Sequence, residues 1–466
     1  MPLLGSLGNL RSNFLTTIGT AQGTGWGLGM TNFTDAYDYK FFEILTDTTG
    51  NLYAIGNYNS GIDIEDYASI VKFDSLGNIV WNKGFTIAGV TTNPVFTNAK
   101  LDNSGNLVIS GTYGSGTSTI VFVTKIASDG SIITTKSMPN RTLVTGEFAI
   151  DSSNNIFVQH RITTSQYLIS KYDPSLNLIN QITVTKPTTF TSFGTFRIQV
   201  DKNDNVIVGG GGFYSTQSIN AYLTASINNT LTTVSYSTCH YNSSQNFGIP
   251  NVMKIDDNNG ICFLQSGSGY MMGVHNNGTA QWASRVIGSH GSYTNMYLTG
   301  SYAYLSDYTL SAGVEGPPST ITKINPVSGN VLWAKRLQID YTKNLTNSRH
   351  TYLSGIGFYN NHIYCGGAWA TDAGVPNFPT AMPMICKLPS NGAIPGTGTY
   401  TDGVISTGKY DIVYSNESTT VTYYSVSTSN EAITLGSYSG NIGNVTSVTG
   451  STFNVSTTTN TLIPFV

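Results

Sequence analysis

The six histidines of this 466-residue chain are its most versatile catalytic side chains, and each stands apart from other catalytic residue types. No HExxH or HxxEH spacing occurs, which a zinc hydrolase uses to bring two imidazoles and a glutamate together. No GxSxG lies between a strand and a helix, where it could form a nucleophile elbow. His362, in NNHIYC, is expected to serve a turn. The sequence therefore predicts a protein that is not an enzyme. The histidines are His160, His240, His275, His290, His350 and His362.

The densest acidic cluster is Asp63, Glu65 and Asp66, in the segment NSGIDIEDYAS. Carboxylates at this spacing on a loop could bind Ca²⁺ through hard oxygen ligands. A solvated loop between two strands is the interpretation that the surrounding sequence favours. We therefore predict no metal.

The four cysteines, Cys239, Cys262, Cys365 and Cys386, show no CxxC spacing and no matching histidines. A zinc site is disfavoured on that ground. Buried free thiols are expected. Cys365 and Cys386 fall on two predicted strands of one repeat, so a disulfide between them is the alternative.

Composition points to strands and turns rather than helices. Only 10% of the residues are charged and the net charge is -3, while 50 residues are glycine and 28 are tyrosine. A typical soluble domain has about 25% charged residues. This balance provides no basic field for phosphates, so no nucleic-acid partner is predicted. The opening MPLLGSLGNL has no signal-peptide apolar core, and no window is apolar enough for a transmembrane helix.

A repeated unit organises the middle of the chain. It consists of a strand, an Asp-rich turn, a strand, a longer connection, a strand, a Gly/Asn turn and a strand. The first copy is FFEILTDTTGNLYAIGNY followed by ASIVKFDSLGNIVWNKGF, and the second is FTNAKLDNSGNLVISGTY followed by VFVTKIASDGSIITTKSM. Seven copies are recognisable, spaced by about 52 residues between Asn51 and Asn361. This period is close to that of propeller blades, which is about 40–50 residues.

The turns of the repeat have a simple chemical explanation. Asp47, Asp74 and Asp102 are placed to cap the turn with a carboxylate. Gly50, Gly77 and Gly105 would provide the left-handed residue of a bulged hairpin. If the repeats are aligned correctly, four asparagines occupy equivalent turns on one rim: Asn51, Asn106, Asn155 and Asn205.

Repeats of the form DxxGNxYxxG followed by GxVxW resemble bacterial β-propeller repeats, including those grouped with the quinone dehydrogenases. The resemblance covers residues 33–400 and implies a seven-bladed, all-β propeller. It also implies that Trp81, Trp282 and Trp333 are packing anchors between blades. The quinone enzymes carry adjacent cysteines beside their cofactor, and this chain has no such pair, so no cofactor is predicted.

Two segments fall outside the predicted ring. Residues 1–32 are Gly-rich, show neither helical nor strand periodicity, and are expected to form an irregular attachment arm. The apolar anchors of that arm would be Leu3, Leu4, Leu7, Phe14 and Trp26. Residues 401–466 are Ser/Thr-rich with alternating stretches, and are expected to form a small C-terminal β appendage.

The chain combines the composition of an extracellular β-protein with no standard export signal, and a virion component assembled in the host cytoplasm reconciles the two. The opening LLGSLGNL also resembles the beginnings of structural proteins of marine bacteriophages. The leading interpretation is a non-enzymatic phage structural protein of the tail or capsid surface. It would hold other virion proteins through both terminal regions and bind a host glycan or protein. The alternatives are a bacterial surface or secreted binding propeller and, third, a propeller lyase or glycosidase.

Tyrosine-rich loops suit recognition because they give contact area at low entropic cost. The candidate contact residues lie on the connections expected to leave the second strands. They are Tyr58, Asp63, Glu65, Tyr113 and Tyr214.

Overall fold

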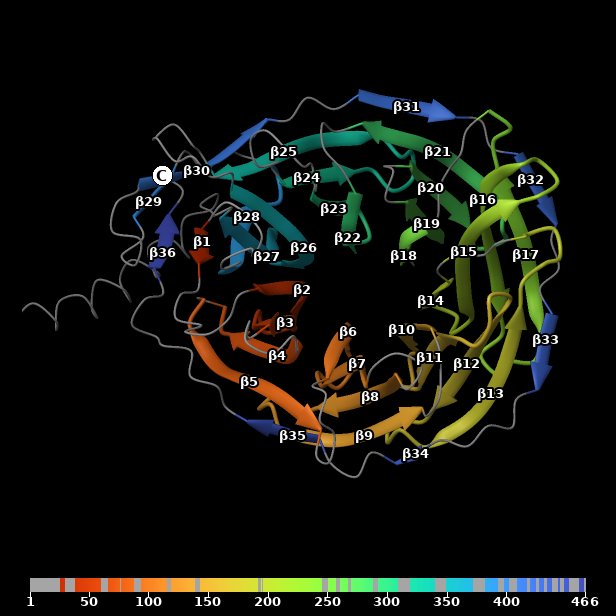
Figure 1. Cartoon of the computed structure of the whole chain (residues 1–466). Helices are drawn as coiled ribbons and strands as arrows, with labels where there is room; N and C mark the ends of the chain where they lie inside the picture. Colours follow the sequence, from red (N-terminus) through yellow and green to blue (C-terminus); the bar gives the residue numbers. More distant parts are fainter. Residues whose placement is uncertain are drawn as a thin grey trace, which may run out of the picture.

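The computed structural model describes residues 26–29 and, with short breaks between strands, residues 38–464. The described strands form seven sheets, six of five strands and one of six. The sheets stand around a central opening (Figure 1). The predicted all-β propeller is therefore confirmed. No helix of the described residues is long and apolar enough to cross a membrane.

Each sheet is antiparallel and runs from the axis outward, and we number the sheets one to seven in the order of their innermost strands (Figure 1). The innermost strands are β2 (Asp38–Thr46), β6 (Val95–Leu101), β10 (Leu143–Ile150), β14 (Phe196–Val200), β18 (Pro250–Asp256), β22 (Ser292–Leu298) and β26 (Arg349–Tyr359). The second strands are β3 (Leu52–Asn59), β7 (Leu107–Tyr113), β11 (Ile156–Arg161), β15 (Val206–Tyr214), β19 (Ile261–Ser266), β23 (Ala303–Tyr308) and β27 (His362–Thr371). The third strands are β4 (Asp66–Phe73), β8 (Ile120–Ile126), β12 (Gln166–Tyr172), β16 (Ile219–Ile227), β20 (Tyr270–His275), β24 (Ser319–Ile324) and β28 (Met382–Pro389).

The fourth strands are β5 (Ile79–Ile87), β9 (Ile132–Met138), β13 (Leu178–Thr185), β17 (Val234–Tyr241), β21 (Ala280–Ile287), β25 (Val331–Ile339) and, in sheet seven, β1 (Trp26–Gly29). The outer strands of sheets one to seven are β35 (Val448–Ser451), β34 (Gly443–Asn444), β33 (Thr434–Ser437), β32 (Ser427–Asn430), β31 (Thr420–Tyr424), β30 (Lys409–Asn416) and β36 (Thr461–Pro464). Sheet six carries β29 (Gly398–Thr401) outside β30.

The turn chemistry predicted from the repeat is confirmed. The Asp47 carboxylate accepts from the Asn51 backbone N–H at 2.9 Å and from its side-chain amide at 2.8 Å. Asp102 binds Asn106 in the same way. Gly50 and Gly105 have φ values of 86° and 78°, the left-handed conformation that favours glycine.

The core lies between the sheets rather than within one of them. Seven clusters of buried apolar side chains are present in the described residues, and each joins one pair of neighbouring sheets. The cluster containing Phe41, Ile44 and Tyr364 joins sheet one to sheet seven. The packing is therefore continuous around the ring, and each strand needs apolar residues on both faces.

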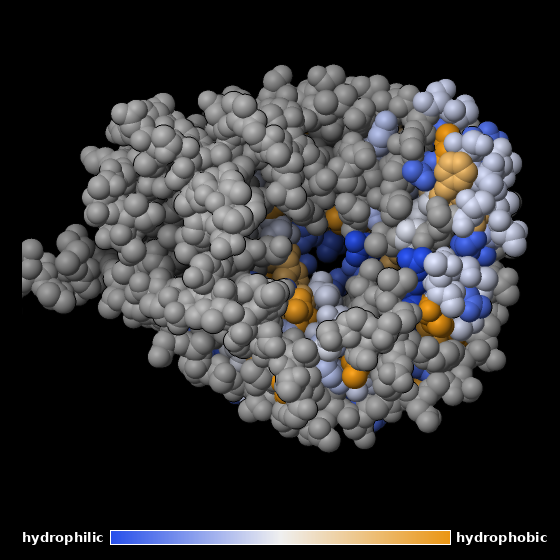
Figure 2. Space-filling view, viewed as in Figure 1, coloured by the Kyte–Doolittle hydropathy of each residue, from blue (hydrophilic) through white to orange (hydrophobic). Residues whose placement is uncertain are grey.

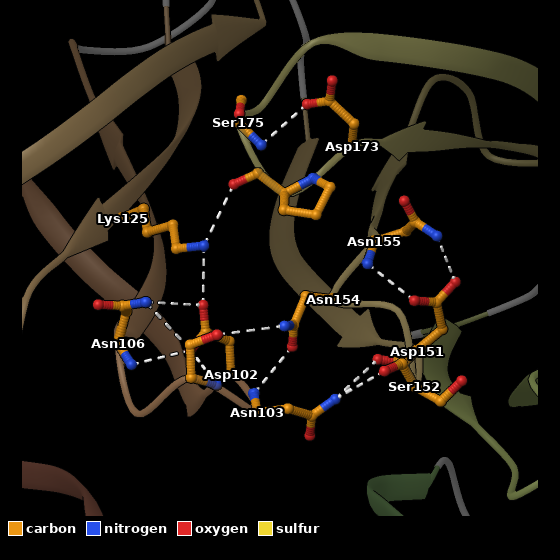
Figure 3. Close-up of polar contacts among 12 residues, drawn as sticks. Asp102, Asn103, Asn106, Lys125, Asp151, Ser152, Asn154, Asn155, Asp173 and Ser175 are labelled. Atoms are coloured by element: carbon orange, nitrogen blue, oxygen red, sulfur yellow. Dashed lines mark hydrogen bonds and ion pairs between the residues drawn. The ribbon is translucent and has the colours of Figure 1, made fainter.

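A lysine recurs near the end of the third strand, and in Lys72, Lys125, Lys171 and Lys323 it donates to a group of the next sheet. It recurs in five repeats, and its members are 7–9% exposed: Lys72, Lys125, Lys171, Lys323 and Lys387. The Lys125 ammonium lies 2.8 Å from the Asp102 carboxylate in its own sheet and donates to the Pro174 carbonyl of the next sheet at 3.2 Å (Figure 3). Lys72 donates likewise to Ser128 O at 2.9 Å.

Turns of neighbouring sheets also bond directly to each other. The Asn103 backbone N–H donates to Asn154 Oδ1 at 2.8 Å (Figure 3), and the Ser152 N–H donates to Asp204 Oδ1 at 2.8 Å. The turns that contain Asn106, Asn155 and Asn205 therefore lie on one rim, as predicted.

The predicted packing role of the tryptophans also has direct support. Trp81 Nε1 donates to Ser128 O at 3.0 Å, and Trp282 Nε1 donates to Pro326 O at 2.9 Å, in each case a carbonyl of the next sheet. The Trp333 ring lies against Gly392, where an added Cβ would meet its atoms at 3.0 Å.

The N-terminal arm needs a correction, because Trp26 lies in the ring. A ring confined to residues 33–400 requires the fourth strand of the seventh repeat to follow Pro389 along the chain, but β1 takes that place, with Trp26 opposite Lys387. Physically, the third strand of the last sheet has an unpaired edge, and a strand from the other end of the chain satisfies its backbone groups. Leu3, Leu4, Leu7 and Phe14 lie outside the described residues.

The C-terminal region is not a separate appendage, which is a second correction. Its strands pair one by one with the outer edges of the sheets, in the order six, five, four, three, two, one and seven (Figure 1). We call β30 to β36 the belt. An alternating sequence with few charges forms strands readily, and the available partners are the unpaired edges of the ring.

Candidate binding site on the ring axis

Polar and charged residues gather on the innermost strands, two or four positions before the turn. Glu43, Asn98, Glu147, Arg197 and Asn295 lie four residues before it, and Lys100, Gln199 and Lys254 lie two residues before it. Positions two apart on a strand share a face. Figure 2 shows a hollow on the axis of the ring with hydrophilic residues inside it.

Several of these side chains bond across a sheet that lies between their own sheets. Lys100 of sheet two donates to Gln199 Oε1 of sheet four at 2.9 Å. Asn295 of sheet six donates to Glu43 Oε1 of sheet one at 3.2 Å. Each of these bonds passes the innermost strand of the sheet in between, on the side of that strand that faces the ring axis. The residues therefore form one polar site on the axis.

Glu147 is the centre of the first group. Its carboxylate forms an ion pair with Arg197 and accepts from Asn98 Nδ2 at 3.2 Å. The residue is 9% exposed. Arg197 Nε is buried and has no hydrogen-bond partner, so the guanidinium keeps one donor for another group.

Lys100 is the centre of the second group. Its ammonium lies 5.8 Å from the centroid of the Phe148 ring. Burial, followed by repulsion from Lys254, lowers the pKa of Lys100 to about 7, against the attraction of Glu147 and Glu43. Gln199, which accepts from Lys100, donates in turn to Met253 O at 3.1 Å.

Glu43 completes the site. Burial raises the pKa of Glu43, against the attraction of Lys254 and the hydrogen bond from Asn295. The site thus contains two carboxyl groups and three basic side chains. Chemically, this arrangement offers an excess of positive charge in a sheltered hollow and a lysine that titrates near neutral pH.

The contact residues predicted from the sequence do not come together at this site. Tyr214 ends β15, is 4% exposed and packs against Phe190 and Tyr241, so its expected place on an open connection is wrong. Tyr113 ends β7, where its half-buried ring packs against Phe122. Tyr58 lies in β3 opposite Tyr67. Asp63 and Glu65 lie outside the described residues.

The cysteines are neighbours in the sheet and are not bonded. Cys365 and Cys386 occupy opposite positions on β27 and β28, and both are buried free thiols. Cys239 is also a buried thiol. The expected buried thiols are confirmed for these three, and the alternative disulfide is absent.

Sequence reasoning missed the axial residues, although a signal for them exists. Charged residues are scarce in this chain, yet five of them occur at the same two positions before the turn in different repeats: Glu43, Lys100, Glu147, Arg197 and Lys254. Apolar residues at these positions would have indicated that apolar side chains fill the centre of the ring, whereas charged residues indicate a polar centre. Comparing the innermost strands of the turn-aligned repeats would have revealed the shared polar positions.

Comparison with known proteins shows no family for this chain. No family model and no curated protein matches the chain. Among solved structures, the WD40 repeats of RRP9 match with a TM-score of 0.47 and 7% identity, over 78% of this chain and 99% of that one. The WD40 propeller domain of Doa1 matches with a TM-score of 0.44 and 8% identity, over 78% and 97%. A protein of unknown function from Bacteroides caccae matches with a TM-score of 0.34 and 10% identity, over 67% and 93%.

Proposed function

We propose that this protein is a non-enzymatic structural component of a bacteriophage virion, at the tail or capsid surface, that displays a seven-bladed propeller. In this proposal each sheet is one blade, and a ring face or rim contacts a host glycan or protein. The observation that carries it is the position of the chain ends: Trp26 of β1 lies opposite Pro464 of β36 in the outer part of sheet seven. Both ends of the chain therefore leave the ring at one place.

This position suits a tethered display module. A partner that binds residues 1–25 or the last residues of the chain would contact one blade and leave the other blades accessible to a ligand. The apolar side chains of the arm could anchor it, since a fully buried large apolar side chain contributes about 1.5–3 kcal/mol.

The belt supports the same proposal. An unpaired sheet edge is a template for pairing with another chain. Here the fourth strand of every sheet is covered by the protein's own C-terminal strands. Apart from β30 these strands are two to five residues long, and such short edge strands are poor templates for pairing between closely spaced copies.

The test is particle incorporation of one N-terminal deletion and one substitution variant. Deleting residues 1–25 should leave a folded propeller, because β1 is retained. This propeller should no longer incorporate into particles. Replacing Leu3, Leu4 and Leu7 by Ser keeps the length of the arm and removes three of its apolar anchors. This variant should also incorporate less. Incorporation of the deleted protein at the normal copy number would contradict the tether.

A second assay separates the display role from the alternatives. The purified protein is incubated with host cells and with their envelope polysaccharide. Binding without cleavage agrees with the proposal. Depolymerisation that a single Asp or Glu substitution abolishes would replace it by a lyase or glycosidase, and detection of the protein on bacterial cells without phage would favour a bacterial surface propeller.

A further inference from the structure

We propose that the axial site binds a small oxyanion, of the phosphate, sulfate or carboxylate class, between Lys100, Lys254 and Arg197. This binding is independent of where the protein is displayed and of what its outer faces contact. It rests on three properties of the site: its charge, its unused donors and its shelter from solvent.

The charge of the site is not balanced by the protein. Lys100, Arg197 and Lys254 face two carboxyl groups, of which Glu147 is already paired with Arg197. Glu43 is the remaining acid, so the two lysines face one unpaired carboxyl group, whose pKa is raised by burial. Lys100 and Lys254 repel each other as a result. Because buried charges are normally paired, an anion is the group that this site lacks.

The site also has donors without acceptors. Arg197 uses a terminal nitrogen for Glu147, and its buried Nε has no partner. The Lys100 ammonium has three donors, and Gln199 Oε1 accepts from one of them. An oxyanion offers several acceptor oxygens that can satisfy such a set, and charge-assisted bonds of this kind are the stronger ones.

The location favours a small ligand. The donors come from the innermost strands of sheets two, four and five. Figure 2 shows a hydrophilic hollow on the ring axis, which these strands surround. A site enclosed by strands on all sides admits an ion or the acid group of a small molecule. Its low dielectric strengthens the attraction relative to water.

Binding should depend on pH through the groups that face Lys100. Below pH 7 the Lys100 ammonium is charged, and it attracts the anion together with Lys254 and Arg197. Above pH 7 it loses its proton, so the site attracts an anion less strongly. Affinity is therefore expected to fall as the pH rises from 6 to 8.5.

The experiment measures thermal stability and calorimetric binding of the full-length protein with sodium sulfate, inorganic phosphate, glucuronate and sodium chloride at equal ionic strength. At pH 6 the oxyanions should raise the melting temperature saturably and chloride should not. The two inorganic salts and the sugar acid distinguish a free ion from the acid group of a larger molecule. Lys254→Met should weaken binding at least tenfold, and Lys202→Met, at an exposed rim turn, should leave it unchanged.

A measurement on the unaltered protein keeps the proposal falsifiable if Lys254→Met does not fold. Titration of lysine Nζ by NMR should show one lysine near pH 7, and saturating sulfate should move its pKa upward by at least one unit. An unchanged titration, or stabilisation by sulfate no greater than by chloride, would overturn the proposal and leave a purely structural polar network.

Discussion

The Lys125 side chain offers the sharpest test of how the sheets are held together. It is 7% exposed, its ammonium lies 2.8 Å from the Asp102 carboxylate, and it reaches the Pro174 carbonyl of the next sheet. Removing one partner of a buried ion pair costs about 3–5 kcal/mol, because the other charge stays buried without compensation. Asp102 keeps bonds from Ser104 and Asn106, so Lys125→Met should cost about 3 kcal/mol, the lower end of that range.

Lys72→Met is the matched control. Lys72 occupies the same position in the first repeat, donates to Ser128 O and lies over the Tyr53 ring. A hydrogen bond to a charged group contributes about 1.5–3 kcal/mol, so the control should fall near the lower end. The difference between the two variants measures the contribution of Asp102.

Urea unfolding followed by tryptophan fluorescence gives these free energies, and a double-mutant cycle with Asp102→Asn isolates the pair. The cycle should show a coupling of about 1–3 kcal/mol. Equal costs for Lys125→Met and Lys72→Met, together with a coupling near zero, would refute the reasoning. The ion pair would then add nothing beyond the carbonyl bond.

The same pair predicts an acid dependence. Burial acts to raise the pKa of Asp102, but the bonds from Lys125 and Asn106 outweigh it and hold the pKa below its usual value. The pair therefore stabilises the fold above the ordinary carboxyl pKa of about 3.9, and this contribution is lost as the pH falls through the lower, folded-state value. Asp102→Asn should remove that part of the acid transition.

Three further perturbations follow from the geometry. Gly50→Ala should destabilise the protein about 1–3 kcal/mol more than Gly105→Ala in thermal unfolding. Both glycines have positive φ, but only at Gly50 would the new Cβ lie too close to another atom, 2.5 Å from Tyr359 Cε1. Equal losses of stability in the two variants would contradict this. Burial lowers the pKa of His240 to about 3, whereas an unfolded histidine titrates near about 6.5. The free energy of unfolding should therefore fall as the pH drops from about 6.5. In urea titrations, the free energy of unfolding of His240→Asn should depend less steeply on pH over that range. Deleting residues 402–466 should leave a folded ring with open sheet edges that associates at lower concentration in light scattering, and a monomeric truncated protein would show that the belt does not protect the edges.

The turns could be predicted from the sequence because their causes are local. Asp47 binds Asn51 within five residues, and Gly50 has the φ that such a turn requires. The same reasoning aligned the repeats and led to the propeller. Even where glycine is replaced, as at Asn154 with φ 64°, the turn keeps its conformation.

The axial site could not be predicted in this way because its contacts are not local. Lys100 and Gln199 are 99 residues apart, and Asn295 and Glu43 are 252 apart. Spacing motifs search for partners within one element, whereas the ring brings equivalent positions of different repeats together. Tyr214 fails for a related reason: a tyrosine at the end of a strand resembles a loop residue until Phe190 and Tyr241 are seen to cover it.

The belt shows how the two ends of the chain secure one another. A four-residue strand such as β1 would fray at the edge of a sheet, since few backbone bonds hold it. In sheet seven, β1 is paired on both sides: Leu28 lies opposite Ile385 of β28 and Leu462 of β36. The belt reaches β36 only after it has passed along sheets six to one. The strand that closes the ring is therefore paired on both edges, so β1 can leave the sheet alone only by losing its backbone bonds to both β28 and β36.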